Sequence, residues 1–238
     1  MAITVPPELD YALDLLGFQW PNIDEDAVRD AATLLRTLRE DLQTTLDTLD
    51  DRIDGDLAEA FTSKTATAYI EAWTENRTAN MDQMLDLLPG VADGLDLFAD
   101  AVVALKTKVI AELVITAAQL AATAASAVLT LGASAAASAA ILVARKKALD
   151  ILTQIAVDEL IGQVAIMVIE PLSSSLEGLV AAVLDHPITS AGSQPDRYDA
   201  DFDLMEQIAD AIDDCGTDQE ELLSTFATQI AGLPIFVV

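Results

Sequence analysis

The sequence is poor in the residues that enzyme sites, disulfide frameworks and metal centres most often need. Its 238 residues contain one cysteine and one histidine, and aromatic residues make up only 5%. A lone Cys215 cannot form an intramolecular disulfide, and we expect it to be a buried or idle thiol, with an intermolecular disulfide as the alternative. His186 falls in a loop-like stretch that does not place it beside Cys215 or a serine. With no glycine-rich phosphate loop either, the sequence predicts no enzyme activity, no metal and no cofactor.

Basic residues are also scarce. Twelve Lys and Arg stand against forty Asp and Glu, which gives a formal net charge of −28. Such a field repels nucleic acid and anionic lipid, so we expect no nucleic-acid partner. The acidic excess lies in residues 1–100 and 186–238, whereas residues 101–185 carry seven acidic and five basic side chains. This distribution indicates a nearly neutral core with a strongly hydrated coat.

The remaining composition favours helices, because alanine is abundant and glycine and proline are few. Between Asn22 and Gly55, apolar residues recur at spacings of three and four, which predicts a long amphipathic helix with Glu25 in a capping box. A second helix over residues 56–88 is expected to fold back at Gly55 as an antiparallel hairpin. Its polar stretch over residues 74–80 should loosen or kink it.

Two stripes of this hairpin are candidates for a partner interface. Phe61, Tyr69 and Trp73 line one face of the second helix, and Leu35, Leu42 and Leu49 lie on the apolar side of the first. For the aromatic stripe, plain internal core is the favoured interpretation, and a docking site for another protein is the alternative.

A run of thirty-two residues, Leu113–Ala144, carries no charged side chain. Its length would allow a membrane span, but fourteen of these residues are alanine and only ten are leucine, isoleucine or valine. Small residues suit closely packed helices, so we favour a buried hairpin that turns near Gly132. A membrane-inserting hairpin with Leu113, Gly132 and Ala144 is the alternative. Basic residues flank the run at Lys106 and Arg145.

The expected fold is all-α: an elongated antiparallel helical hairpin that continues into a bundle of long Ala-rich helices. We divide the chain into an N-terminal segment with the hairpin (1–90), an Ala-rich body after a break at Pro89 and Gly90 (91–185), a linker (186–200) and an acidic C-terminal helical pair (201–238). The second helix of that pair should begin at Thr217 in a capping box. The final apolar residues, GLPIFVV, must pack or attach to something.

The N-terminal segment resembles a known family. Its pattern PPEL…LLG…WP…DED is carried by the following residues: Pro6, Pro7, Glu8, Leu9, Leu15, Leu16, Gly17, Trp20, Pro21, Asp24, Glu25 and Asp26. With the acidic hairpin and the Ala-rich body, the chain over residues 1–185 resembles the WXG-like N-terminal domain of actinobacterial type VII secretion substrates. That domain is best known from mycobacterial channel-forming toxins. The chain departs from the pattern by lacking a Trp-X-Gly turn and a clear Tyr-X-X-X-Asp/Glu signal.

The resemblance implies a non-enzymatic helical targeting and delivery module of a type VII secreted effector or toxin. It would act through helix–helix binding to small helical secretion partners, as a hetero- or homo-oligomer. The N-terminus has no basic region of a secretory signal peptide, so we expect export by a route without one, with attachment to the cell surface left open. Two alternatives remain: a channel-forming protein that inserts residues 109–169, and an acidic helical chaperone or immunity partner of a basic toxin.

Overall fold

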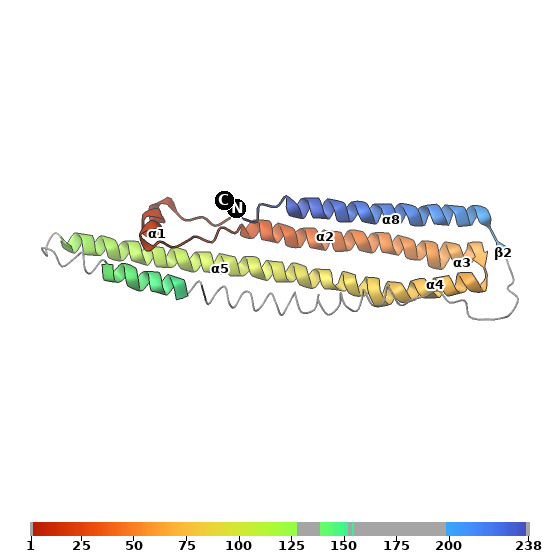
Figure 1. The fold of residues 1–238 in the computed structure, drawn as a ribbon, viewed down its shortest axis with the longest axis horizontal. Helices are drawn as coiled ribbons and strands as arrows, with labels where there is room; N and C mark the ends of the chain where they lie inside the picture. Colours follow the sequence, from red (N-terminus) through yellow and green to blue (C-terminus); the bar gives the residue numbers. More distant parts are fainter. Residues whose placement is uncertain (1, 128–138, 152–153, 155–198, 237–238) are drawn as a thin grey trace. The chain divides into compact units, whose positions relative to one another are not determined.

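The chain is helical in nearly all of the part that the computed structural model describes, which is residues 2–127, 139–151, 154 and 199–236 (Figure 1). The elements in chain order are η1 (Pro7–Leu9), α1 (Asp10–Leu16), α2 (Glu25–Asp50), η2 (Asp51–Leu57), α3 (Ala58–Ala60), β1 (Phe61–Thr62), α4 (Lys64–Asn76), η3 (Arg77–Met81), α5 (Asp82–Ala127), β2 (Asp199–Ala200) and α8 (Phe202–Ala231). Residues 139–151 form a further helix. The all-α prediction is confirmed.

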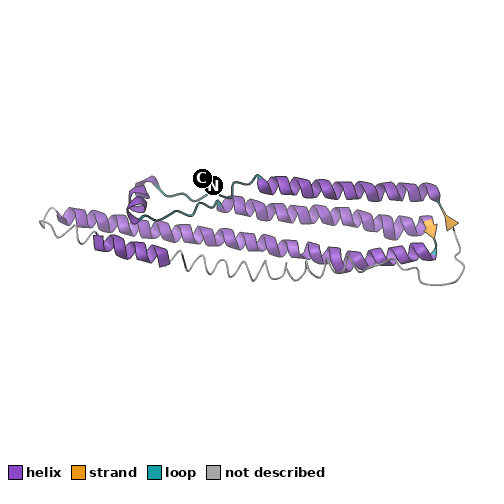
Figure 2. Cartoon of the chain, viewed as in Figure 1, coloured by secondary structure: helices purple, strands orange, loops and turns teal. Residues whose placement is uncertain are grey.

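The only extended pairing among the named elements is very short. β1 and β2 are antiparallel, with Phe61 opposite Ala200 and Thr62 opposite Asp199, and Figure 2 shows these two strands among the helices. Residues 199–200 were expected to be the end of a linker, and they instead form β2. Residues 186–198 of that predicted linker, including His186, lie outside the described residues.

The contacts between residues divide the chain into two compact units. Unit 1 consists of the described residues within Met1–Asp30, Leu95–Ala165 and Pro234–Val238, and unit 2 of those within Ala31–Gly94 and Ile166–Leu233. Both units contain antiparallel parts of α2 and α5. In unit 1 Arg29 pairs with Asp100, and in unit 2 Arg36 pairs with Asp93, so residue numbers rise along one helix as they fall along the other.

The core of unit 1 joins the N-terminal segment to α5. Seven buried residues form it: Leu9, Ala12, Leu16, Leu105, Val109, Leu113 and Leu149. Gly17 ends α1 in the left-handed region, with φ of 59°, where a glycine carries no steric penalty. Phe18 and Trp20 are partly buried and pack against the same core. The C-terminal tail attaches to unit 1 as well, because Ile235 accepts a backbone hydrogen bond from Asp24 at 2.8 Å.

The start of α2 differs from the prediction. The helix begins at Glu25, and the Asp24 carboxylate accepts hydrogen bonds from the backbone N–H groups of Asp26 and Ala27 at 2.9 and 3.2 Å. Asp24, rather than Asn22, is therefore the N-cap. Glu25 does not act in a capping box, because its carboxylate is buried and bound to Lys106.

The turn of the hairpin also lies later than predicted. Helical backbone continues past Gly55 through η2, a π-helical segment, and α3 to Ala60, and the reversal takes place over residues 61–63. Ile53 and Ala60 are buried on either side of Gly55, so packing holds the helix through the glycine. The predicted irregularity over residues 74–80 is present as η3, a second π-helical segment.

Two further predicted breaks are absent. α5 runs from Asp82 to Ala127 with Pro89 inside it, although an internal proline costs a helix about 3 kcal/mol. Pro89 and Gly90 lie on its exposed side, whereas Leu85 and Ala92 are buried and hold the helix together. The acidic C-terminal pair is likewise one helix, α8, and Thr217 lies within it rather than at a cap.

The uncharged run is only partly described. Leu113 is fully buried in the unit 1 core and Ala144 is exposed, while Gly132 and its predicted turn lie outside the described residues. None of the helices in the described ranges is both long enough and apolar enough to cross a membrane.

Candidate functional site

The apolar stripe of α2 forms the centre of unit 2. Leu38, Leu42, Leu46 and Leu49 recur at spacings of three and four and are each at most 8% exposed. Leu85 of α5 is 1% exposed and completes the group. We call these five residues the leucine seam.

α8 packs on the leucine seam. Cys215 is buried within the cluster, and Ile212, Leu222 and Phe226 are partly buried against it. Their spacing puts all four on one side of α8, as a helix with an apolar stripe requires. Gln219 adds a polar contact from the same side, since its amide donates to the Thr45 hydroxyl at 3.4 Å. Unit 2 is thus a bundle in which the last helix of the chain covers the hairpin.

A charged cluster borders the seam at η3. The indole N–H of Trp73 donates to Asp50 at 2.7 Å, and Arg77 contacts Asp50 at 3.0 Å and Asp47 at 3.3 Å. Arg77 also pairs with Asp82. Burial alone would lower the pKa of the guanidinium, but these hydrogen bonds and charges raise it, so Arg77 stays ionised. The cluster fixes Trp73 beside the seam.

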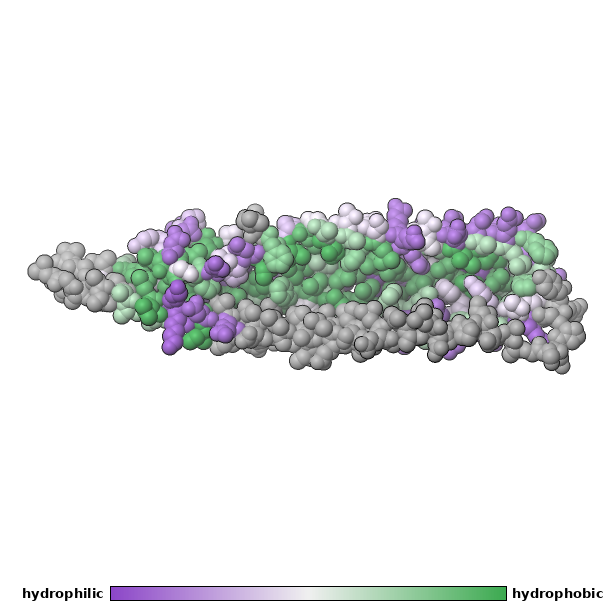
Figure 3. All heavy atoms as spheres, viewed as in Figure 1, coloured by the Kyte–Doolittle hydropathy of each residue, from purple (hydrophilic) through white to green (hydrophobic). Residues whose placement is uncertain are grey.

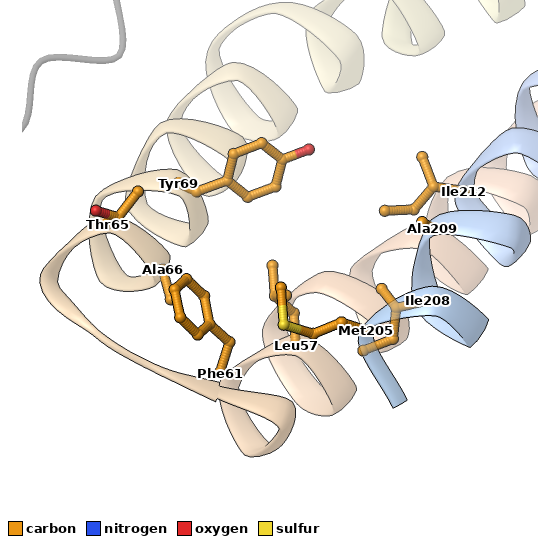
Figure 4. Close-up of a pocket in the computed structure, with 9 residues that line it drawn as sticks. All are labelled: Leu57, Phe61, Thr65, Ala66, Tyr69, Met205, Ile208, Ala209 and Ile212. Carbon is orange, nitrogen blue, oxygen red and sulfur yellow. The ribbon is translucent and has the colours of Figure 1, made fainter. Parts of the chain in front are cut away.

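An apolar pocket opens next to the hairpin turn (Figure 4). Its volume is about 280 Å³. The lining side chains come from η2, β1 and α4 on one side and from α8 on the other: Leu57, Phe61, Thr65, Ala66, Tyr69, Met205, Ile208, Ala209 and Ile212. The turn itself is held by the Ser63 hydroxyl, which accepts a hydrogen bond from the Ala66 N–H at 3.0 Å and caps α4.

The start of α8 is fixed against the same turn. The Asp201 N–H donates to the Ala60 carbonyl at 2.8 Å, and the Asp201 carboxylate caps α8 by accepting from the Leu204 N–H at 3.1 Å. Asp199, Asp201 and Asp203 have the spacing of the first ligands in a calcium-binding loop. Asp201 has a structural role instead, as the N-cap of α8. Among the residues that the structure describes, no group of three or more His, Cys, Asp or Glu is placed to hold a metal ion.

Cys215 is a buried free cysteine whose surroundings disfavour the thiolate. Burial against the leucine seam raises its pKa, and the nearby charges of Asp218 and Asp214 raise it further, against a smaller opposite effect from Arg52. A thiol with a raised pKa has little thiolate at neutral pH. The predicted buried thiol is therefore confirmed.

The structure divides the six predicted interface residues into three groups. Leu42, Leu49 and Trp73 meet in the cluster around the leucine seam. Phe61 and Tyr69 line the pocket, and Tyr69 is 36% exposed. Leu35 is half-buried and lies outside the cluster.

The sequence did not reveal what covers the seam. Ile212, Leu222 and Phe226 have helical spacing and could have been recognised as an apolar stripe, but a stripe alone does not tell which helix it meets. Arg77 was also missed. It lies in a stretch that is polar on all sides, and its aspartate partners Asp47 and Asp50 are about thirty residues away in the sequence.

Unit 1 contains a second polar centre. The Lys106 ammonium donates to the Glu25 carboxylate and to the Ile23 carbonyl, each at 2.6 Å, and it lies 5.8 Å from the Trp20 ring centroid. Both charged side chains are 2% exposed. Arg145, which follows the uncharged run, pairs with Glu112 at 2.8 Å. The bases that flank the run, Lys106 and Arg145, are thus each paired with a glutamate.

Comparison with known proteins gives one match. The model of the protein family described as the WXG100 like domain matches residues 9–146, which is more than half of the chain. The match includes α1, both arms of the hairpin and all the residues that form the leucine seam and its charged border; α8 lies beyond it. No curated protein and no solved structure matches the chain.

Proposed function

The chain belongs to the WXG100-like domain family, and from this membership we propose that it is a non-enzymatic targeting and delivery module of a type VII secreted effector. Family members are helical proteins of type VII secretion, a route that does not use a signal peptide, and they typically pair with helical partners. In our proposal the hairpin is the element that the secretion system handles, and it assembles with a small helical protein through its apolar side chains.

The observation that carries the proposal is the family match over residues 9–146, which covers the hairpin with its leucine seam. A seam of large aliphatic side chains at helical spacing is suited to contact another amphipathic helix. The pocket beside the turn adds apolar surface at the same hairpin, with Tyr69 partly exposed. Neither feature brings together a nucleophile, a general base and an oxyanion site.

The test is an export assay. An epitope-tagged full chain is expressed in a host with an active type VII system and in a matched strain whose secretion ATPase is inactivated, with and without co-expressed small helical proteins of that system. We expect the chain in the culture filtrate only when the ATPase is active, and we expect a small helical protein to co-purify with it. A cytosolic protein serves as the lysis control.

Equal amounts in both filtrates, or retention in both strains, would contradict delivery by this route. Leakage of dye from liposomes by the purified chain would favour the channel alternative instead. Tight, salt-sensitive binding to a basic toxin by a chain that is retained in both strains would favour the chaperone alternative.

A further inference from the structure

The helix that packs on the leucine seam, α8, lies outside the hairpin in the sequence. The family match ends at residue 146, whereas α8 begins at Phe202. The apolar contacts of α8 to the seam centre on Cys215, with Ile212, Leu222 and Phe226 around it. The seam is therefore an apolar helix-binding face that already holds one helix.

Charge opposes the packing of α8. α8 carries eight acidic and no basic side chains, and residues 31–94 carry thirteen acidic and five basic ones. Within the described residues, none of the α8 carboxylates forms an ion pair. In the view of Figure 3, hydrophilic side chains follow the outer edge of α8, and apolar atoms fill the band next to it. Like charges on both sides weaken this contact, whereas a helix with basic flanks would gain from the same field.

α8 also has a weak point at the centre of its contact. Gly216 follows the buried Cys215, and glycine inside a helix costs about 0.5–1 kcal/mol relative to alanine. A Cβ added at Gly216 would meet no heavy atom within 4 Å. The glycine is thus not required by packing, and it lowers the stability of α8.

We infer that the leucine seam is the binding face for an amphipathic helix with basic flanks from a partner protein, and that α8 is an internal occupant which this helix displaces. The inference rests on the proposed function, since it names the chemistry of the partner helix and its competitor. Binding of the partner then requires α8 to leave the seam. Because α8 is tethered, its effective concentration is on the order of millimolar, so a weakly held helix still occupies the seam when no partner is present.

Cys215 provides a direct reporter. It is the sole cysteine of the chain and is 7% exposed, so an alkylating reagent can react with it only when α8 leaves the seam. The probe is a synthetic peptide with the sequence of residues 202–231, carrying C215A together with D213K, D214K and D218K. The matched control peptide carries C215A alone. Each is titrated to about 1 mM against the full chain, and the alkylation rate of Cys215 is measured by mass spectrometry.

We expect the basic peptide to bind and to raise the alkylation rate by about tenfold or more, and the acidic control to raise it less. The difference should shrink in 0.5 M NaCl, because salt screens the charges. In the full chain, G216A should slow alkylation about two- to fivefold, the factor that the glycine–alanine difference in helix propensity corresponds to. F226D should speed alkylation while circular dichroism still shows a folded protein.

Three results would overturn the inference. The first is binding of the basic peptide with no change in Cys215 alkylation, which would place the peptide elsewhere. The second is an equal effect of both peptides. The third is dimerisation of the chain with Cys215 exposed, which would identify a second copy as the occupant. The export assay uses neither peptide nor reagent, so failure of the delivery function remains distinguishable from failure of this inference.

Discussion

At the scale of single residues, unit 1 contains an ion pair whose two side chains are both buried. Lys106 and Glu25 are each 2% exposed and 2.6 Å apart. Replacing one partner of a buried ion pair typically costs about 3–5 kcal/mol, because the other charge stays buried without compensation. We therefore expect K106M to lower the free energy of unfolding by about 3 kcal/mol or more, as measured by urea denaturation followed by circular dichroism. The double variant K106M/E25Q should recover most of the loss.

The same pair makes stability depend on pH in a defined direction. Burial by itself would raise the pKa of Glu25, but the hydrogen bonds from Lys106 and the Ile3 N–H and the charge of Lys106 outweigh it, so the pKa lies below its ordinary value. A depressed pKa contributes stability that is fully present above the unfolded-state pKa of about 4.3 and is lost as pH falls through the folded-state pKa. The stability difference between wild type and E25Q should therefore shrink as pH falls below about 4. A difference that grows in acid would contradict the assignment.

In unit 2, Arg77 is the buried charged side chain that is stabilised by ion pairs. Its side chain is 8% exposed and contacts three aspartates, one of which also accepts the Trp73 indole N–H. R77A should cost about 1–3 kcal/mol, since charge-assisted hydrogen bonds are lost and Asp50 is left only partly exposed. R52A is the matched control, because Arg52 forms an exposed pair with Asp56 at 2.5 Å, and such pairs contribute less than about 1 kcal/mol. Equal losses for both variants in urea denaturation would show that the Arg77 cluster is not specifically stabilising.

At the scale of elements, Ser63 is the side-chain cap of α4 at the turn of the hairpin. Ser63 is 7% exposed, and its hydroxyl satisfies the Ala66 N–H at the first turn of α4. S63A should therefore lower the free energy of unfolding by about 1 kcal/mol, the usual loss for an N-cap. T48A is the control, because the exposed Thr48 hydroxyl only contacts its own helix, at the Thr44 carbonyl, and should change stability by less than about 0.5 kcal/mol. A thermal melt in which T48A loses more stability than S63A would contradict the role of Ser63 as a stabilising cap.

The helices could be predicted from the sequence, because the spacing of apolar residues, as in α2, is a local property of the chain. The residues at which the helices begin and end were predicted less well. Local preference predicts helix boundaries at Gly55, Pro89 and Thr217. Each lies inside helical backbone instead, because buried neighbours on the same helix, such as Ile53, Leu85 and Cys215, outweigh that preference.

At the scale of the whole molecule, self-repulsion is the principal electrostatic effect. The chain has a net charge of −28, and its acidic side chains lie on helices that pack against each other. Raising NaCl from about 20 mM to 500 mM shortens the screening length from roughly 20 Å to roughly 4 Å. We expect the free energy of unfolding to rise by about 1 kcal/mol or more over this range, as measured by urea denaturation at pH 7. A midpoint that stays constant or falls would indicate that the ion pairs outweigh the repulsion.

The helical class, the hairpin, the resemblance to type VII secretion substrates and the burial of Cys215 could be predicted from the amino-acid sequence. Each of these depends on composition, on local periodicity or on a short motif. The contacts of Lys106 with Glu25, of Arg77 with three aspartates and of α8 with the leucine seam could not be predicted, and they are seen only in the folded chain. An apolar stripe or a charge fixes which side of its own helix faces inward. Which distant helix it meets is decided by packing between segments that are far apart in the chain.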